Sequence, residues 1–226
     1  MSASGPDTTP ARRRAGPRLR LDWERFAYAG KFVLPETGAA VARERDASAP
    51  RVAGPDADPA DLPLDDSVLA AAAVSPDRTA PATLRVRYVT VRVDRRGEGL
   101  GARLLAFVAA RAGERGYERV AIAANNPFAH EAAAKAGFGF TGETTGLAEL
   151  VCARPAGGPP ERVGSSRYAD ALDRFAARPD ADGATAADDS ADPPLAPAER
   201  AFLAERVGPP DPVAVPPSTD ESAPVD

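Results

Sequence analysis

The stretch VTVRVDRRGEGLG, residues 89–101, decides the fold of this chain. Its first half alternates valines with polar residues, which is the period of a strand with one buried face. Its second half brings Gly97, Gly99 and Gly101 into a turn, where the lack of side chains lets backbone amides approach a ligand. Residues 102–112 then repeat apolar side chains at helical spacing. Free amides at a helix N-terminus form an anion site, and phosphate is the usual anion.

Other glycine-rich turns share part of this pattern. Gly97, Gly99 and Ala102 fit the spacing of a Rossmann fingerprint, but that fold requires an acidic residue after the next strand to bind the ribose. Here the next strand ends in Asn125 and Asn126. No Gly-Lys-Ser or Gly-Lys-Thr follows, which excludes a P-loop for nucleoside triphosphates. A plain turn without a ligand leaves three glycines and two adjacent arginines unexplained.

The segment from Arg96 to Gly101 resembles the Arg/Gln-x-x-Gly-x-Gly/Ala signature of the GCN5-related N-acetyltransferases. A second strand at 120–124 then precedes the segment NPFA at 126–129 and the pair Gly137-Phe138, which is similar to the family's Asn-x-x-Ala and Gly-Phe segment. The resemblance covers roughly residues 67–154. It implies an α/β (α+β) fold, with a mixed, mostly antiparallel central sheet flanked by helices and a β-α-β crossover at the coenzyme A site.

The resemblance also implies how acetyl-coenzyme A binds. The turn would hold the pyrophosphate, and a side chain on Gly99 or Gly101 would stand between an amide and the phosphate. The strand before the turn would carry a bulge, separate from the next parallel strand and offer amides to the pantetheine and to the thioester carbonyl. The implied binding residues are Val89, Thr90, Val91, Arg96, Gly97, Glu98, Gly99, Leu100, Gly101, Asn126 and Ala129. Asn126 is also a good N-cap for the second helix.

The proton donor is where the sequence departs from the family pattern. Many members place a tyrosine in the second helix as an acid for the coenzyme A thiolate, and that position falls on Ala133. Glu143, Glu149 and Tyr88 are candidates for a base acting through water, and the sequence does not choose among them. The expected function is an acyl-coenzyme A-dependent N-acetyltransferase that moves an acetyl group to an amine by direct attack. The alternative is a non-catalytic acyl-coenzyme A-binding module that regulates a partner.

Composition excludes several other classes. The 226 residues carry a net charge of -5, which argues against a nucleic-acid partner. Cys152 is the only cysteine and lies in an apolar run, which favours a buried structural thiol over a nucleophile. His130 is the only histidine, so neither a zinc site nor a Ser-His-Asp triad has support and no metal is expected.

Cell location is predicted from the absence of an export or membrane signal. No apolar run approaches the roughly 20 residues of a membrane span, so we expect a cytoplasmic protein without a membrane partner. The oligomeric state is open, and a dimer is one possibility. Lys31 and Lys135 are the only lysines, and this acid-rich, lysine-poor composition is typical of salt-loving organisms.

The domain organisation is read from changes in composition. Residues 1–16 are expected to be a disordered arm and residues 17–154 the acetyltransferase domain, with a flexible insertion at 46–66. Residues 155–226 would hold a linker, two short helices and an acidic, proline-rich disordered tail. The region 18–26 reads as a short strand or helix. The predicted strands are 38–45, 67–74, 84–93, 119–124, 138–141 and 146–153, and the predicted helices are 101–115, 127–136, 167–178 and 198–207.

Overall fold

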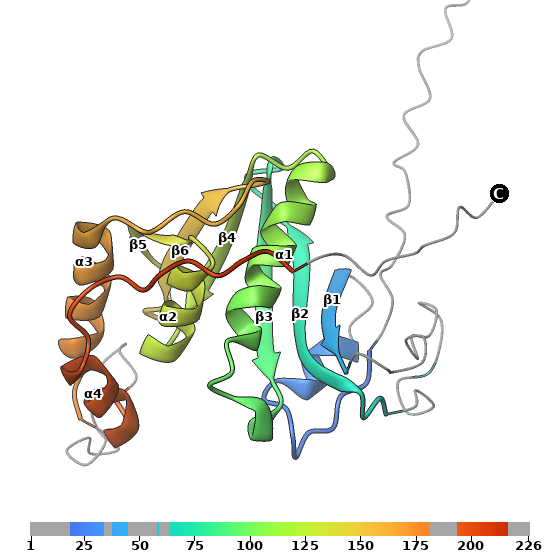
Figure 1. Ribbon diagram of the computed structural model, residues 1–226, viewed down its shortest axis with the longest axis horizontal. Coiled ribbons are helices and arrows are strands. Elements are labelled where there is room, and N and C mark those ends of the chain that lie inside the picture. The colour runs from blue at the N-terminus through green and yellow to red at the C-terminus, as the bar shows by residue number, and fades with distance from the viewer. Residues whose placement is uncertain (1–18, 34–37, 45–57, 59–63, 181–193, 217–226) are drawn as a thin grey trace, which may run out of the picture.

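The computed structural model describes residues 19–33, 38–44, 58, 64–180 and 194–216. These residues form a six-stranded sheet in the order β1-β2-β3-β4-β6-β5, with helices packed against it (Figure 1). Within this sheet β3 and β4 run parallel and every other neighbouring pair is antiparallel. The prediction of a mixed, mostly antiparallel sheet with one β-α-β crossover is therefore confirmed.

The elements lie close to where the sequence placed them. The strands are β1 (Gly38–Arg43), β2 (Val68–Pro76), β3 (Thr83–Val91), β4 (Arg119–Ala124), β5 (Gly139–Thr144) and β6 (Leu150–Pro155). The helices are α1 (Leu100–Glu114), α2 (Pro127–Lys135), α3 (Ser165–Ala176) and α4 (Pro197–Ala204), with 3-10 turns η1 (Ala29–Val33) and η3 (Val93–Arg95). The strand or helix suggested for 18–26 is wrong, because residues 19–22 have no regular structure and residues 23–28 form turns and a bend. The arm at 1–16 and most of the insertion at 46–66 lie outside the described residues.

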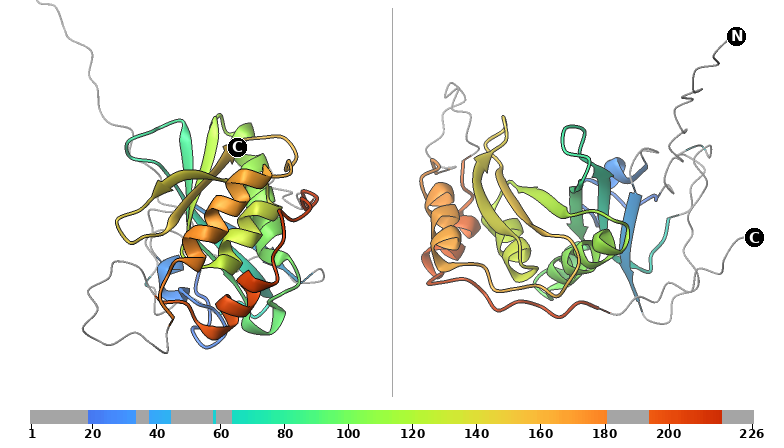
Figure 2. Two further views of the ribbon diagram at one scale, coloured as in Figure 1. Left: turned by 90° about the vertical axis from the view of Figure 1, so that its left-hand side faces the viewer. Right: turned by 90° about the horizontal axis from the view of Figure 1, so that it is seen from above.

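Strand β2 shows how the sheet is covered on both faces. Alternate residues of a strand point to opposite faces. Ala70 and Ala72 belong to the core formed with α1 and α2, whereas Ala71 and Ala73 pack against the N-terminal segment 19–32. The sheet is therefore the middle layer, with the helices on one face and the N-terminal segment on the other (Figure 2).

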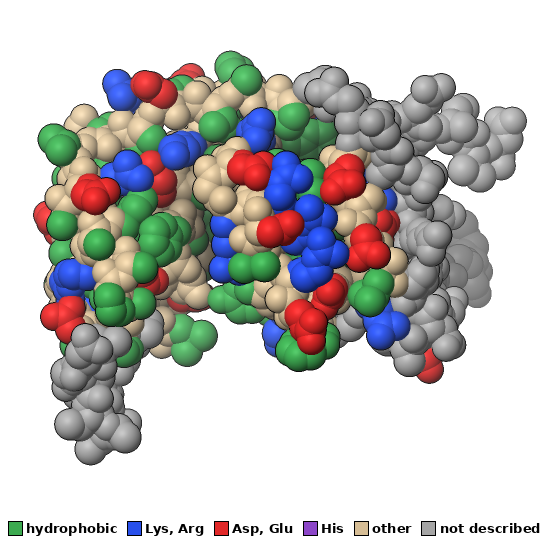
Figure 3. Space-filling view, turned by 60° about the horizontal axis from the view of Figure 1, so that its bottom comes forward, with side chains coloured by type: hydrophobic (Ala, Val, Ile, Leu, Met, Phe, Trp, Pro, Cys, Tyr) green, Lys and Arg blue, Asp and Glu red, His purple; other side chains and the backbone are tan. Residues whose placement is uncertain are grey.

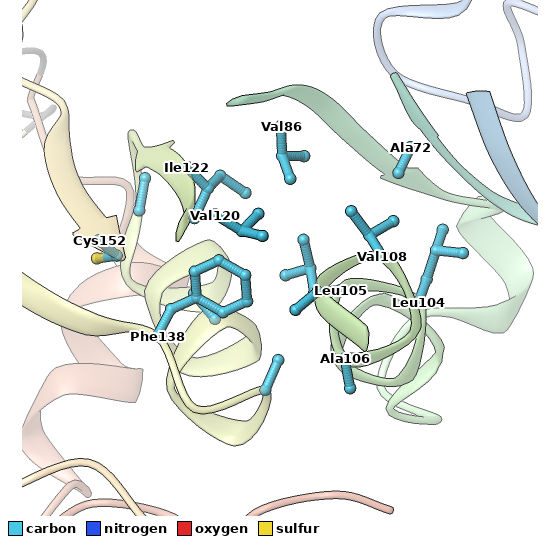
Figure 4. Packing of buried hydrophobic residues seen from close by; sticks show 14 of the residues in the cluster. Ala72, Val86, Leu104, Leu105, Ala106, Val108, Val120, Ile122, Phe138 and Cys152 are labelled. Carbon is cyan, nitrogen blue, oxygen red and sulfur yellow. The ribbon is translucent and has the colours of Figure 1, made fainter. Parts of the chain in front are cut away.

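The largest buried hydrophobic cluster, called the main core here, lies between the sheet and the helices. Figure 4 shows Val86 of β3 and Ile122 of β4 pointing toward Leu105 of α1, with Phe138 closing the cluster from below the sheet. These side chains are buried and belong to one cluster. The core joins β3, β4 and α1 at the point where the two parallel strands meet, and so fixes the elements that carry the predicted site.

The segment after β6 is bound to the domain by a buried arginine. The guanidinium of Arg154 donates hydrogen bonds to carbonyl oxygens of Ala136 (2.8 Å), Gly157 (3.0 Å) and Pro159 (2.9 Å). Gly113 of α1 packs so tightly here that an added Cβ would lie 2.6 Å from the Cα of Gly157. Residues 155–160, where the sequence suggested a linker, are therefore held against the domain.

The C-terminal segment also packs on the helical face. Phe175 of α3 is fully buried in the main core. Beyond α4 the chain runs back across α2 and α1 (Figure 1), and the Val213 amide donates to the Lys135 carbonyl at 2.8 Å. Val213 and Val215 pack against the core. Up to residue 216 this order differs from the predicted disorder, and residues 217–226 lie outside the described part. None of the described helices is long and apolar enough to cross a membrane.

Candidate functional site

The parallel strands β3 and β4 separate part of the way along, and the opening between them is called the fork here. Their pairing covers Thr83–Val86 on β3 and Arg119–Ile122 on β4. Beyond it β3 stays paired with β2 as far as Val91, and β4 stays paired with β6 as far as Ala124. Among the described residues, the backbone groups of β3 beyond Val86 that would face β4 therefore have no partner strand on that side. The separation implied by the family resemblance is present.

A β-bulge lies at the base of the fork. On β2, Ala73 pairs with Tyr88 and its neighbour Val74 pairs with Val86, so Arg87 is an extra residue on β3. A bulge bends its strand and increases the local twist, which helps β3 turn away from β4. The bulge that the family resemblance implied is therefore present in this chain.

The sequence itself signals this bulge through a change of phase in its apolar pattern. Leu84 and Val86 face the helical core, and so do Val89 and Val91. Two even-numbered and two odd-numbered residues can share one face only if a residue is inserted between them. The change of phase in the apolar pattern between residues 86 and 89 places the extra residue in that interval.

The turn after β3 presents uncapped amides to open space. Gly97 has a φ of 86° and Gly99 a φ of 74°, a region that side-chain-bearing residues rarely adopt. Gly99 is the N-cap of α1 and supplies no side-chain cap, so the first-turn amides of α1 have no partner within the helix. An added Cβ at Gly97 or Gly99 would meet no atom within 4 Å. The turn therefore fits a phosphate group, which would accept hydrogen bonds from these amides.

Two other residues of the turn play different parts. An added Cβ on Gly101 would be in van der Waals contact with Val91 of β3, 3.4 Å from its Cγ2. That a side chain at Gly101 would block the amides stays a prediction. The Glu98 carboxylate is held by the guanidinium of Arg95 at 2.7 and 2.8 Å, which lowers its pKa and neutralises its charge beside the amides.

The remaining predicted binding residues lie around the same end of the fork. Arg96 is exposed between η3 and the glycines, and Leu100 begins α1 with its side chain half buried. Thr90 is buried on the face opposite α1. Figure 3 turns this end of the molecule toward the viewer and shows Lys and Arg side chains mixed with Asp and Glu side chains. Basic and acidic charges are interspersed, so binding of an anion there would depend on the backbone amides.

The start of α2 is tied to the N-terminal segment by side-chain amides. The Asn126 Oδ1 accepts from the Ala129 amide at 2.8 Å, which confirms the predicted N-cap. Its Nδ2 donates to the Asn125 Oδ1 at 2.8 Å, and the Asn125 Nδ2 donates to the Tyr28 hydroxyl at 3.1 Å. Sequence reasoning missed Tyr28 and the role of Asn125, because Tyr28 stands in an unpatterned segment and no motif marks it.

The structure separates the three candidate bases. Tyr88 lies on β3 at the fork, with its ring centroid 5.8 Å from that of Tyr28. Glu149 stands before β6, and its carboxylate accepts from the Thr145 hydroxyl at 3.1 Å within the β5–β6 hairpin. Glu143 is exposed on β5. Tyr88 is thus the candidate that contacts the side chains found at the fork.

The second helix provides no acid for the fork. Ala133, at the position where the family pattern has a tyrosine, is fully buried in the main core, so a tyrosine there would overpack it at a cost of about 1–3 kcal/mol. The His130 ring is fully buried between Tyr168 and Phe175 of α3. Within the described residues no group of three or more His, Cys, Asp or Glu side chains could hold a metal ion.

The chain is similar to one protein-family model and to several solved structures. The model of the acetyltransferase (GNAT) family matches residues 19–138, more than half of the chain. Nourseothricin acetyltransferase is 25% identical over 41% of this chain and 61% of its own, with a TM-score of 0.36. A GCN5-related N-acetyltransferase from Kribbella flavida is 23% identical over 39% and 61%, with a TM-score of 0.35. A phosphinothricin acetyltransferase from Sinorhizobium meliloti, solved with acetyl-coenzyme A, is 19% identical over 42% and 58%, with a TM-score of 0.37. No curated protein matches the chain.

Proposed function

The chain belongs to the acetyltransferase (GNAT) family, and from that premise we propose that it moves the acetyl group of acetyl-coenzyme A to an amine by direct attack on the thioester. The observation that carries the proposal is the continuity of the fork with the turn. Free backbone groups of β3 lead from the last β3–β4 pair, at Val86, to the uncapped amides of α1. One extended ligand with a phosphate end and an amide-bearing arm would satisfy both.

Each part of this path has a distinct task. The turn from Arg96 to Gly101 binds the pyrophosphate through amides and through the N-terminal dipole of α1. The backbone of Val89–Val91 pairs with the pantetheine arm. An amide of this strand faces the thioester carbonyl and stabilises the negative charge that develops on its oxygen during attack. The amine acceptor reaches the thioester through the open end of the fork.

Direct attack requires no covalent intermediate with the protein. A thiol with an ordinary pKa of about 8.5 is a tolerable leaving group. The chain's own thiol is unsuited to attack, because burial raises the pKa of Cys152 to about 12 and leaves no thiolate at neutral pH.

Replacing Cys152 with Ala is expected to leave most of the acetyl transfer activity intact. The side chain is fully buried and takes no part in the fork, so its loss leaves only a small cavity. Turnover of the variant with the best amine substrate, together with the intact mass of wild type mixed with acetyl-coenzyme A, tests this. An acetyl adduct on Cys152 would contradict direct attack.

A non-catalytic acyl-coenzyme A-binding module is the second candidate. The buried Ala133 favours it, because no helix tyrosine is present to protonate a thiolate. A turnover assay on a panel of amines separates the two functions. Binding of acetyl-coenzyme A without release of thiol on any amine would favour the module.

A thermal-shift experiment with Gly99→Val tests the binding site itself. Ligand at 100 times its Kd stabilises the native state by about 2.7 kcal/mol, so acetyl-coenzyme A should raise the Tm of the wild type. A valine at Gly99 would project into the open space over the amides and abolish this shift. The positive φ would also lower the Tm without ligand, since a side chain in this region costs about 1–2 kcal/mol.

Gly116→Val is the matched control for that strain. Gly116 has a φ of 82° and open space around its Cα, but it follows the C-terminal end of α1. Both variants should melt lower than the wild type, and only Gly99→Val should lose the response to acetyl-coenzyme A. An equal response of the two variants would rule out the turn as the phosphate site.

A further inference from the structure

A directed series of hydrogen bonds ends at the hydroxyl of Tyr28. The Asn126 Oδ1 is fixed as an acceptor by the Ala129 amide, so the Asn126 Nδ2 must be the group that donates to the Asn125 Oδ1. The Asn125 Nδ2 is then the group that donates to the phenolic oxygen of Tyr28, at 3.1 Å. The Tyr28 oxygen therefore acts as an acceptor in this series, and its own proton is left to donate to another group.

The Tyr28 hydroxyl lies at the open end of the fork. The Tyr28 ring packs on Tyr88, which stands on β3 two residues beyond the last β3–β4 pair. Its hydroxyl meets Asn125, which directly follows β4. Tyr28 therefore spans from one separated strand to the other, about 7–10 Å beyond the point where they part, at about 3.3 Å per residue. The side chain is 49% exposed, so a ligand in the fork can reach it.

Other contacts hold Tyr28 and Asn125 in place. Tyr28 has a φ of 59°, a left-handed conformation that costs a non-glycine residue free energy and concentrates at functional sites. Its carbonyl accepts from the Lys31 amide at 2.8 Å. The Asn125 carbonyl accepts from the Arg178 guanidinium at 2.8 Å, and Arg178 also bonds to the Ala148 carbonyl at 2.7 Å. The hydroxyl is thus positioned from both sides of the fork.

We propose that Tyr28 is the catalytic acid that protonates the departing coenzyme A thiolate; this inference rests on the proposed acetyl transfer. The amine lone pair forms the C–N bond to the acetyl carbon, and the C–S bond breaks with its electron pair on sulfur. The sulfur takes the proton of the Tyr28 hydroxyl. The phenolate then regains the proton that the acetylated nitrogen loses. Until the phenolate regains this proton, the hydrogen bond from Asn125 stabilises its negative charge.

Tyr28→Phe tests the proposal because it keeps the ring on Tyr88 and removes only the hydroxyl. We expect kcat to fall by about 10²-fold or more, with the KM for acetyl-coenzyme A unchanged. Tyr117→Phe, a half-buried tyrosine in the main core, is the control for loss of a phenol elsewhere and should keep the wild-type kcat.

Asn125→Asp provides a second, independent variant. The carboxylate has the shape of the amide but only accepts hydrogen bonds, so it would take the Tyr28 proton for itself. We expect a loss of kcat similar to that of Tyr28→Phe, although the tyrosine is still present. Wild-type kcat in either variant, or a loss confined to the KM of the amine, would overturn the proposal.

A binding measurement keeps the test independent of the amine. At pH 9.5, above the thiol pKa of about 8.5, Tyr28→Phe should bind free coenzyme A more weakly than the wild type and acetyl-coenzyme A equally well, because a thiolate accepts the phenol proton and a thioester sulfur does not. Equal affinity of both proteins for free coenzyme A would overturn the acid role. A wild type that binds neither compound would instead refute the proposed function, and the acid role with it.

Discussion

Phe175→Ala is expected to lower the free energy of unfolding by about 3–5 kcal/mol. The Phe175 side chain is fully buried in the main core, and its deletion removes a large apolar group and leaves a cavity. This residue lies outside the 19–138 segment that the family model matches. A loss of this size would therefore show that α3 is part of the cooperative unit formed by the acetyltransferase core.

The matched control is Phe128→Ala on α2. Phe128 is 46% exposed and packs on Phe202 with 4.8 Å between ring centroids, so the same chemical change should cost about 1 kcal/mol. Urea unfolding of the two variants and the wild type gives both differences. Equal, small losses would mean that α3 unfolds independently of the core.

The same substitution is expected to affect the fork. Arg178 follows α3, packs on the Phe175 ring with 4.7 Å from its Cζ to the ring centroid, and donates to the Asn125 carbonyl. Loss of the ring should loosen Arg178 and, through it, Asn125. The C-terminal segment would then contribute to the site as well as to stability.

His130→Phe is expected to change how stability depends on pH. The imidazole is fully buried, and neither ring nitrogen has a hydrogen-bond partner among the described residues. Burial lowers the pKa of His130 from 6.5 to about 4, against the opposing effect of the neighbouring Glu131 charge. Protonation of His130 is therefore much easier in the unfolded chain than in the folded one.

The direction in which pH changes the free energy of unfolding follows from proton binding by the folded and unfolded chains. Between pH 6.5 and pH 4 the unfolded chain binds more protons at this site, so the free energy of unfolding falls as the pH falls. With one pKa unit worth about 1.4 kcal/mol, the His130 contribution lost by pH 4 is about 3 kcal/mol. Phenylalanine does not titrate and fills the same space between Tyr168 and Phe175, so this part of the pH dependence should disappear.

Urea unfolding at pH 7 and pH 4.5 gives the change in the free energy of unfolding between the two pH values for each protein. Subtracting the change in His130→Phe from that in the wild type leaves the His130 contribution, because the carboxylates that titrate in both proteins contribute equally. His130→Phe should also be more stable than the wild type at pH 7 by about 1 kcal/mol, because two buried nitrogens without partners are removed. His130→Gln is the control, since it does not titrate but remains polar. It should lose the pH slope without the gain at pH 7, and a wild-type slope in either variant would contradict the explanation.

The fold and the glycine turn were predictable because local patterns encode them. The alternation of valines with polar residues predicted β3 and an apolar run predicted β2, each to within a few residues, and Asn126 before Pro127 marked the start of α2. The glycines at 97 and 99 indicated a turn with free amides because only glycine readily adopts the backbone angles found there. The bulge could also have been read from the phase change before Val89.

Tertiary structure decided the features that depend on residues far apart in the chain. The hydrogen bond from Asn125 to Tyr28 joins residues 97 positions apart, and the bond from Arg178 to Asn125 joins residues 53 positions apart. No local pattern specifies such a contact, because packing of the N-terminal segment and of α3 brings these side chains to the fork. The sequence by itself determined the strands, the helices and the glycine turn before α1. Long-range packing decided which side chains stand where the chemistry would occur.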